Sequence, residues 1–247
     1  MKCTLTHGAL VFVAAFTISA AAQTQATRPN GPAAFLFAYS PKTDQESRFG
    51  EGYRRHLAWH RNAHDPLLWY GWYVTAGERI GTFIDGTFGI SFAAFDKRVE
   101  PKADGADFEQ NVAPFATPLW RAVYRLRSDL STAQPLETQK PSALAEVTHV
   151  AVEPGTEREF EKVLEAVRME LLSAKPPIAF TCYQLVAGLQ QSSYLLMVSR
   201  SGWADYDTAS PLPDVIDRTW SGRSARIVQR MATETWSYRP DLSQLPE

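Results

Sequence analysis

The feature that most constrains the fold of this chain is an internal repeat. Short segments recur in the same order at an offset of 111 residues. The corresponding pairs are Ala76-Gly77 and Ala187-Gly188, Phe83-Ile84 and Tyr194-Leu195, and residues 92–96 and 203–207. A series of matches at one offset indicates a tandem duplication. We therefore divide the chain into two copies of one unit, residues 34–131 and residues 145–243.

Both copies show the same order of predicted elements. The first copy has strand patterns at residues 34–40, 67–75, 80–87 and 119–127, and helix patterns at 45–64, after Ser91 and near 108–112, beyond a polar stretch at 101–106. The second copy has strand patterns at residues 145–152, 179–187, 192–199 and 233–239, a helix at 156–173 and a broken helical region at 203–231. The order β-α-β-β-α-β is ferredoxin-like, so we expect an α+β fold.

The second predicted strand is apolar on both of its faces. Trp69 and Tyr73 point to one side, while Tyr70, Trp72 and Val74 point to the other. Helices cover only one face of a ferredoxin-like sheet, so the other face must be buried against something else. We expect the two copies to pack sheet to sheet within the one chain.

This arrangement resembles the dimeric α+β barrel superfamily, here formed by a single chain. Residues 81–84, Gly-Thr-Phe-Ile, and the helix start at residues 92–96, Phe-Ala-Ala-Phe-Asp, are similar to NIPSNAP-type members. The resemblance implies a pocket between helix and sheet, of the type that cofactor-independent monooxygenases and haem-degrading enzymes of the superfamily use. No residue of this chain matches one of their catalytic signatures.

The N-terminal residues 1–22 are typical of an export signal. Lys2 precedes an apolar run at residues 9–22, and Ala20-Ala21-Ala22 predicts cleavage before Gln23. A retained anchor helix is the alternative, although the run is short for a bilayer. We expect a periplasmic or secreted protein whose mature form has no membrane span, with a flexible N-terminus at residues 23–33. Residues 132–144, which contain two prolines, are expected to be a linker.

Three histidines are spaced four residues apart on the first predicted helix. His56, His60 and His64 therefore share one helix face, and imidazoles at this spacing can chelate a transition metal or approach a haem iron. A carboxylate from elsewhere would have to complete such a site, and Asp85 and Asp96 are the candidates.

The repeat argues against a three-histidine site. In the second copy His56 and His60 correspond to Val167 and Leu171, which belong to an apolar stripe. Both histidines are therefore expected to face the sheet, as hydrogen-bonded core residues, as the lining of a pocket or, least favoured, as metal or haem ligands. His64 is expected to be solvated.

The differences between the copies place the candidate pocket in the first copy. Asp85 corresponds to the apolar Leu196 of the second copy, and aromatic residues are concentrated in the first. The predicted pocket residues are His56, His60, Trp69, Trp72, Tyr73 and Asp85.

The leading functional hypothesis is a small-molecule binder without a cofactor. One alternative is an enzyme of the cofactor-independent or haem-degrading monooxygenase type, with haem or a transition metal as the less favoured cofactors. The other alternative is a structural protein. The chain has 25 Lys and Arg against 27 Asp and Glu, which gives no reason to expect nucleic acid as a partner. We expect a monomer or a weak homo-oligomer.

Overall fold

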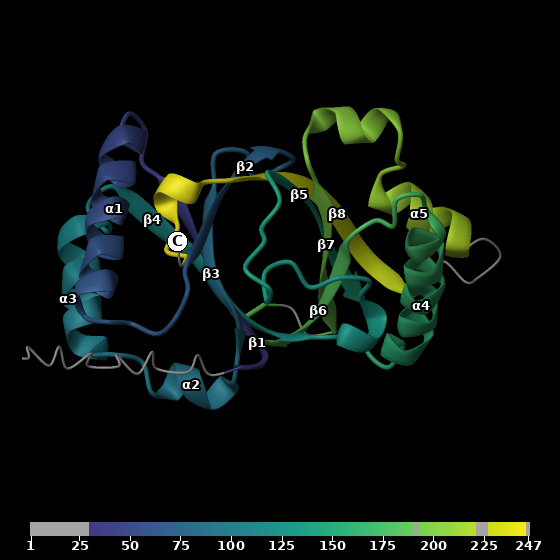
Figure 1. The fold of residues 1–247 in the computed structure, drawn as a ribbon, viewed down its shortest axis with the longest axis horizontal. Coiled ribbons are helices and arrows are strands. Elements are labelled where there is room, and N and C mark those ends of the chain that lie inside the picture. The colour runs from purple at the N-terminus through teal and green to yellow at the C-terminus, as the bar shows by residue number, and fades with distance from the viewer. Residues whose placement is uncertain (1–29, 190–191, 221–226, 246–247) are drawn as a thin grey trace, which may run out of the picture.

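A closed barrel of eight strands forms the centre of the molecule, with helices on its outside (Figure 1). The computed structural model describes residues 30–189, 192–220 and 227–245. The export signal predicted at residues 1–22 lies outside the described residues. The mixed α+β fold expected from the sequence is confirmed, and the barrel closes within a single chain.

The two halves of the chain have parallel inventories. The first half contains β1 (Asn30–Pro41), α1 (Glu46–Asn62), β2 (Tyr70–Ala76), β3 (Phe83–Ile90), α2 (Phe92–Asp96), α3 (Pro101–Asn111), β4 (Ala116–Leu126) and the 3-10 turn η1 (Ser128–Leu130). The second half contains β5 (Leu144–Val152), α4 (Glu157–Ser173), β6 (Phe180–Ala187), β7 (Ser193–Arg200), η2 (Trp203–Asp207), α5 (Leu212–Trp220), β8 (Val228–Tyr238) and η3 (Pro240–Leu242).

The strand order is the same in both halves. It is β4-β1-β3-β2 in the first half and β8-β5-β7-β6 in the second, and the antiparallel pairs β2–β8 and β4–β6 close the barrel. Helices α1 and α3 cover the outside of the first half, and α4 and α5 cover the outside of the second, on opposite sides of the barrel in Figure 1. Since helices cover only the outer face, the inner faces of the two halves meet inside the barrel.

The barrel interior is a shared hydrophobic core. Tyr70, Trp72 and Val74 of β2 point inward as their alternation predicts, and Trp72 contacts Trp236 of β8. Trp69 and the half-buried Tyr73 point outward, toward the helical layer. The alternation along β2 therefore separates side chains that fill the barrel from side chains that can reach the layer beneath α1 and α3.

The segment that joins the halves, residues 132–144, contributes Leu136 to the barrel core. Leu136 is buried in the interior core, and its carbonyl oxygen accepts a hydrogen bond from the Tyr70 hydroxyl at 2.6 Å. The Tyr183 hydroxyl donates to Glu137 at 2.7 Å. The burial of Leu136 was not predicted, because the prolines and polar residues around it are typical of an exposed linker.

Two boundaries predicted from the sequence are wrong. Strand β1 begins at Asn30, so residues 30–33 of the expected flexible N-terminus belong to the sheet, where Ala33 pairs with Ile90 and Arg125. The polar stretch at 101–106 is helical and forms the start of α3, where Pro101 lies in the first turn, a position that suits proline.

No helix among the described residues combines the length and apolar character that crossing a membrane requires.

Candidate functional site

A cavity of about 440 Å³ lies between the first-half sheet and helices α1 and α3. Its aromatic lining residues are Phe37, Tyr39, Tyr53, Trp69 and Phe108. Its ionisable lining residues are His56, His60, Asp85, Arg98, Asp104, Glu109 and Arg121. We call this cavity the first-half pocket.

Four of the six residues predicted for a pocket line this one: His56, His60, Trp69 and Asp85. The other two do not. Trp72 points into the barrel because it alternates with Trp69 along β2. Tyr73 shares the outer face but packs against Phe83 and beneath the guanidinium of Arg239, away from the pocket lining.

Gly52 allows α1 and α3 to approach closely enough to form the pocket wall. A Cβ atom at Gly52 would lie 1.8 Å from the backbone oxygen of Asn111 on α3. Any side chain at this position would therefore force the two helices apart. The close approach brings the histidines of α1 to the carboxylates of α3.

Gly52→Ala should destabilise the fold by about 1–3 kcal/mol, because overpacking of this size requires backbone movement. Gly50→Ala on the same helix is the matched control, since its new Cβ would meet only the Arg54 guanidinium, at 3.8 Å. The control should be neutral or slightly stabilising, because alanine favours helix over glycine. Urea unfolding of both variants measures the difference, and equal midpoints would contradict the close contact.

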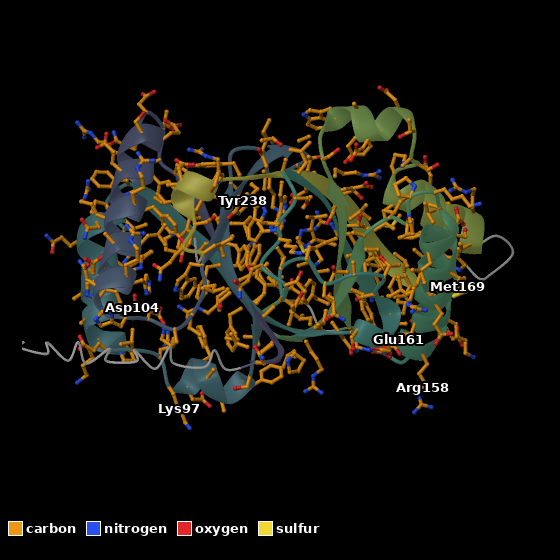
Figure 2. The ribbon with its side chains drawn as sticks, viewed as in Figure 1. Lys97, Asp104, Arg158, Glu161, Met169 and Tyr238 are labelled. Carbon is orange, nitrogen blue, oxygen red and sulfur yellow. The ribbon has the colours of Figure 1, made fainter. Side chains whose placement is uncertain are left out.

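His56 and His60 lie four residues apart on α1, and both are buried. Each Nδ1 contacts a carboxylate: His56 contacts Asp107 at 2.8 Å, and His60 contacts Asp65 at 2.8 Å. Each Nε2 faces the same atom, Asp104 Oδ1, at 3.5 Å from His56 and 3.7 Å from His60. The two imidazoles and Asp104 thus converge on one point. Figure 2 shows Asp104 in the helical layer beside α1.

The carboxylates behind the histidines are themselves held in place. Asp65 accepts hydrogen bonds from the Leu67 amide and the Trp69 indole, each at 3.0 Å. Burial alone would raise the pKa of Asp65, but these bonds and the one from His60 outweigh it and lower the pKa. Asp107 accepts from the Asn111 side chain at 3.0 Å.

The surroundings of His56 lower the pKa of its imidazole. Burial lowers its pKa and outweighs the hydrogen bond with Asp107, which acts in the opposite direction. Since Nδ1 of His56 is engaged by Asp107, Nε2 is the ring nitrogen left to face Asp104.

The carboxylate that accompanies the histidines differs from both candidates predicted from the sequence. Asp96 is exposed on α2, and Asp85 is hydrogen-bonded elsewhere in the pocket. Asp104 and Asp107 were missed because the stretch 101–106 was not expected to be helical. Their i, i+3 spacing on a helix was the available signal, since it places both carboxylates on one face. His64 is exposed, as expected.

Asp85 is a buried carboxyl with one free oxygen. Its Oδ2 accepts a hydrogen bond from the Tyr53 hydroxyl at 2.7 Å, and its buried Oδ1 has no hydrogen-bond partner among the described residues. Burial raises the pKa of Asp85 to about 7, against the opposing hydrogen bond from Tyr53. A carboxyl with this pKa can accept or release a proton near neutral pH.

Two arginines supply positive charge to the same pocket. Arg121 lies over the ring of Phe37 and Arg98 over the ring of Phe95, at 4.9 Å and 4.4 Å from the ring centroids. Neither forms an ion pair with any residue in the described part of the chain, and the buried Nε of Arg98 has no hydrogen-bond partner there. Both guanidinium groups are available to an anionic ligand.

A second cavity, of about 290 Å³, holds charged groups that are already paired with one another: Arg79, His149 and Glu234. Arg79 donates to both carboxylate oxygens of Glu234 at 2.7 Å and approaches His149 Nε2 at 2.8 Å. In contrast, the first-half pocket retains unpartnered buried polar atoms, which favours it as the functional site.

Comparison with protein-family models gives no match for this sequence, and comparison with curated proteins gives none either. Solved structures show likeness of fold. A proposed monooxygenase from Lactobacillus acidophilus NCFM has a TM-score of 0.57 at 12% identity, over 87% of this chain and 96% of that one. A mutant chlorite dismutase from Candidatus Nitrospira defluvii has a TM-score of 0.55 at 9% identity, over 86% and 92%.

A haem-binding protein from Thermus thermophilus is also similar, with a TM-score of 0.51 at 9% identity, over 86% of this chain and 92% of that one. At such low identity these likenesses establish the fold alone. The chain has the fold of the dimeric α+β barrel proteins, as the sequence resemblance suggested.

Haem does not fit the two histidines of the first-half pocket. Asp104 Oδ1 lies within 3.7 Å of both Nε2 atoms, where the porphyrin plane would have to pass. The imidazole centroids are only 4.7 Å apart, so each ring also obstructs the axial approach to the other. These residues suit a single ion better than a macrocycle.

Proposed function

We propose that this chain is an exported enzyme that oxidises a small aromatic molecule bearing an acidic proton. The observation that carries the proposal is Asp85, a buried carboxyl with a free oxygen and a pKa near 7, inside an aromatic pocket. Structures with this fold include proteins described as monooxygenases and as anthrone oxidase-like, which supports an oxidative reaction. The proposal replaces simple binding as the leading hypothesis.

The proposed chemistry begins with transfer of the acidic proton to the ionised Asp85 carboxylate. The resulting carbanion or phenolate is rich in electrons and reacts with dioxygen, the co-reactant. For an activated methylene group, one oxygen atom enters a new carbonyl and the other leaves as water, so a CH₂ group and O₂ give C=O and H₂O. Arg98 and Arg121 would hold the anionic substrate, and the aromatic walls would pack against its rings.

We also propose that the two halves descend from one duplicated ferredoxin-like unit similar to NIPSNAP-type proteins. The strand register supports this: Asp85 pairs with Phe37 and Gly71, and Leu196 pairs with Thr148 and Cys182. Every corresponding residue is 111 positions apart, the offset of the sequence repeat. In this scheme the first half kept the pocket while the second became structural.

The proposed oxidation is tested by measuring dioxygen uptake with a panel of hydroxylated polycyclic aromatics. Gly105 lines the pocket, and a Cβ atom there would meet no other atom within 4 Å. Gly105→Phe should therefore fold and narrow the pocket, reducing uptake and ligand affinity at least tenfold. Gly202→Phe, at an equally open position in the second half, is the matched control and should leave both unchanged.

The outcomes separate the three functional hypotheses. Dioxygen uptake that is sensitive to Gly105→Phe supports the enzyme. Ligand binding that is sensitive to Gly105→Phe but accompanied by no turnover would restore the small-molecule binder. Absence of both from the wild-type protein would leave the structural hypothesis.

A further inference from the structure

We propose that His56, His60 and Asp104 form a binding site for one divalent transition-metal ion in the wall of the first-half pocket. The site shares the pocket of the proposed enzyme but does not depend on that proposal, because metal binding can be measured without turnover. Three observations carry it: the geometry of the three ligand atoms, the hydrogen bonds behind them, and the absence of a better partner for them.

The three ligand atoms are close to the separation that a metal ion requires. The two Nε2 atoms lie 3.5 and 3.7 Å from Asp104 Oδ1, and all three atoms lie within 4.8 Å of one another. Ligands bound at 2.0–2.2 Å from a zinc-like ion are separated by about 3–3.5 Å. A small inward shift of the imidazoles would therefore complete the site.

The hydrogen bonds behind the ligands have the pattern found at metal centres. A metal-binding imidazole normally donates its other N–H to a carboxylate or carbonyl, which fixes the tautomer and the ring orientation. Here Asp107 holds Nδ1 of His56, and Asp65 holds Nδ1 of His60. Asp65 is held in turn by the Trp69 indole. Both Nε2 atoms thereby face Asp104.

Neither Nε2 atom has a well-formed hydrogen bond among the described residues. Each imidazole uses Nδ1 for the carboxylate behind it, which leaves Nε2 for a further partner, and both Nε2 atoms face the same atom, Asp104 Oδ1. The distances of 3.5 and 3.7 Å are also too long for good N–H···O hydrogen bonds from Nε2. Both histidine side chains are at least nine-tenths buried. A cation at the point where the three atoms converge would give both Nε2 atoms and Asp104 Oδ1 a common partner.

The ligand types select the class of metal. Two imidazoles and one carboxylate suit iron(II), cobalt(II) or zinc, whereas magnesium and calcium prefer oxygen ligands alone. Three protein ligands leave coordination positions free. Those positions would face the same cavity that Asp85 and Arg121 line.

The test is a titration of tag-free, chelator-treated protein with Co²⁺, followed by its visible absorption and by competition with Zn²⁺. One ion should bind per chain. Asp104→Asn, which is nearly isosteric, and His60→Ala should each weaken binding at least 100-fold. His64→Ala, on the same helix but exposed, should change nothing. Asp107→Asn should weaken binding by roughly 10–100-fold, as expected for a residue that orients a ligand.

Asp85→Asn distinguishes this ligand set from the one predicted from the sequence, and it should leave Co²⁺ binding intact. Circular dichroism checks that each variant is folded. The wild-type protein alone gives a further result: the Co²⁺ complex should show two paramagnetically shifted, exchangeable Nδ1–H proton resonances. No binding of Co²⁺ by the wild type, binding that survives in both His60→Ala and Asp104→Asn, or absence of these resonances would overturn the site. Binding of Co²⁺ without dioxygen uptake would uphold the site and count only against the proposed enzyme.

Discussion

Asp85→Asn is expected to abolish the oxidation proposed for the first-half pocket, lowering the rate about 10²–10⁴-fold, the usual contribution of a positioned general base. Asparagine preserves the size of the side chain and can still accept the Tyr53 hydrogen bond. It cannot take a proton from substrate. The affinity of the pocket for an aromatic ligand should therefore change much less than the rate.

The rate of the wild-type reaction should depend on pH through the protonation of Asp85. The active form is the carboxylate, and burial raises the pKa of Asp85 to about 7, so the rate should fall as pH drops below about 7. Tyr53, Tyr39, Asp104 and Arg121 are the ionisable groups that act on Asp85 from the surrounding helices and strands. Glu109→Gln, at another carboxylate of the pocket lining, is the control and should keep the same inflection.

Asp85→Asn should also stabilise the protein at alkaline pH. The pKa of Asp85 lies above its ordinary value of 3.8, so the folded state holds a proton that the unfolded state releases, and stability falls as pH rises from about 4 to about 7. The full shift corresponds to an upper limit of about 4 kcal/mol. Asparagine should recover roughly 2 kcal/mol of this at pH 8, since its amide remains buried and incompletely paired. A variant that is fully active, or less stable than wild type at pH 8, would contradict this role for Asp85.

Much of the fold could be predicted because the alternation of residues along a strand shows which side chains lie on each face of the sheet. The alternation of Trp69 and Tyr73 with Tyr70, Trp72 and Val74 predicted that both faces of the sheet are buried. Two buried faces in turn predicted that the sheets of the two halves pack against each other. Closure of the barrel could not be deduced, because it depends on edge pairing between β2 and β8 and between β4 and β6. Edge pairing is made by backbone groups, and these leave little trace in the sequence.

The histidines of the candidate site were predicted from the sequence, but Asp104 was not. His56 and His60 lie on one long amphipathic helix, where spacing and comparison with Val167 and Leu171 place them inward. Asp104 belongs to a short helix whose apolar pattern is weak, and its approach to α1 depends on a glycine contact far away in the sequence. Contacts between helices that are not adjacent in sequence are fixed by packing, which a periodicity argument does not reach.

Arg200→Met is expected to have the largest effect on stability, a loss of about 3–5 kcal/mol, because it leaves a buried carboxylate uncompensated. Arg200 and Glu146 are only 2% and 1% exposed, and Arg200 donates to Glu146 and to the carbonyl of Ser210. Glu146 also accepts from the Leu212 amide at the start of α5. Urea unfolding measures the loss, and Arg218→Met on α5, whose partner Glu170 is exposed, should cost less than about 1 kcal/mol.

The double variant Arg200→Met/Glu146→Gln decides whether the buried charge is the cause. Glutamine still accepts from Leu212 but carries no charge, so the double variant should regain at least about 2 kcal/mol of the single variant's loss. A double variant as unstable as Arg200→Met would assign the loss to packing instead. Co²⁺ binding should be unchanged in every folded variant of this series, because the pair lies in the second half. In the second half the corresponding positions hold Val167, Leu171 and Leu196, which pack in a hydrophobic core. In the first half these positions hold His56, His60 and Asp85, which line the pocket.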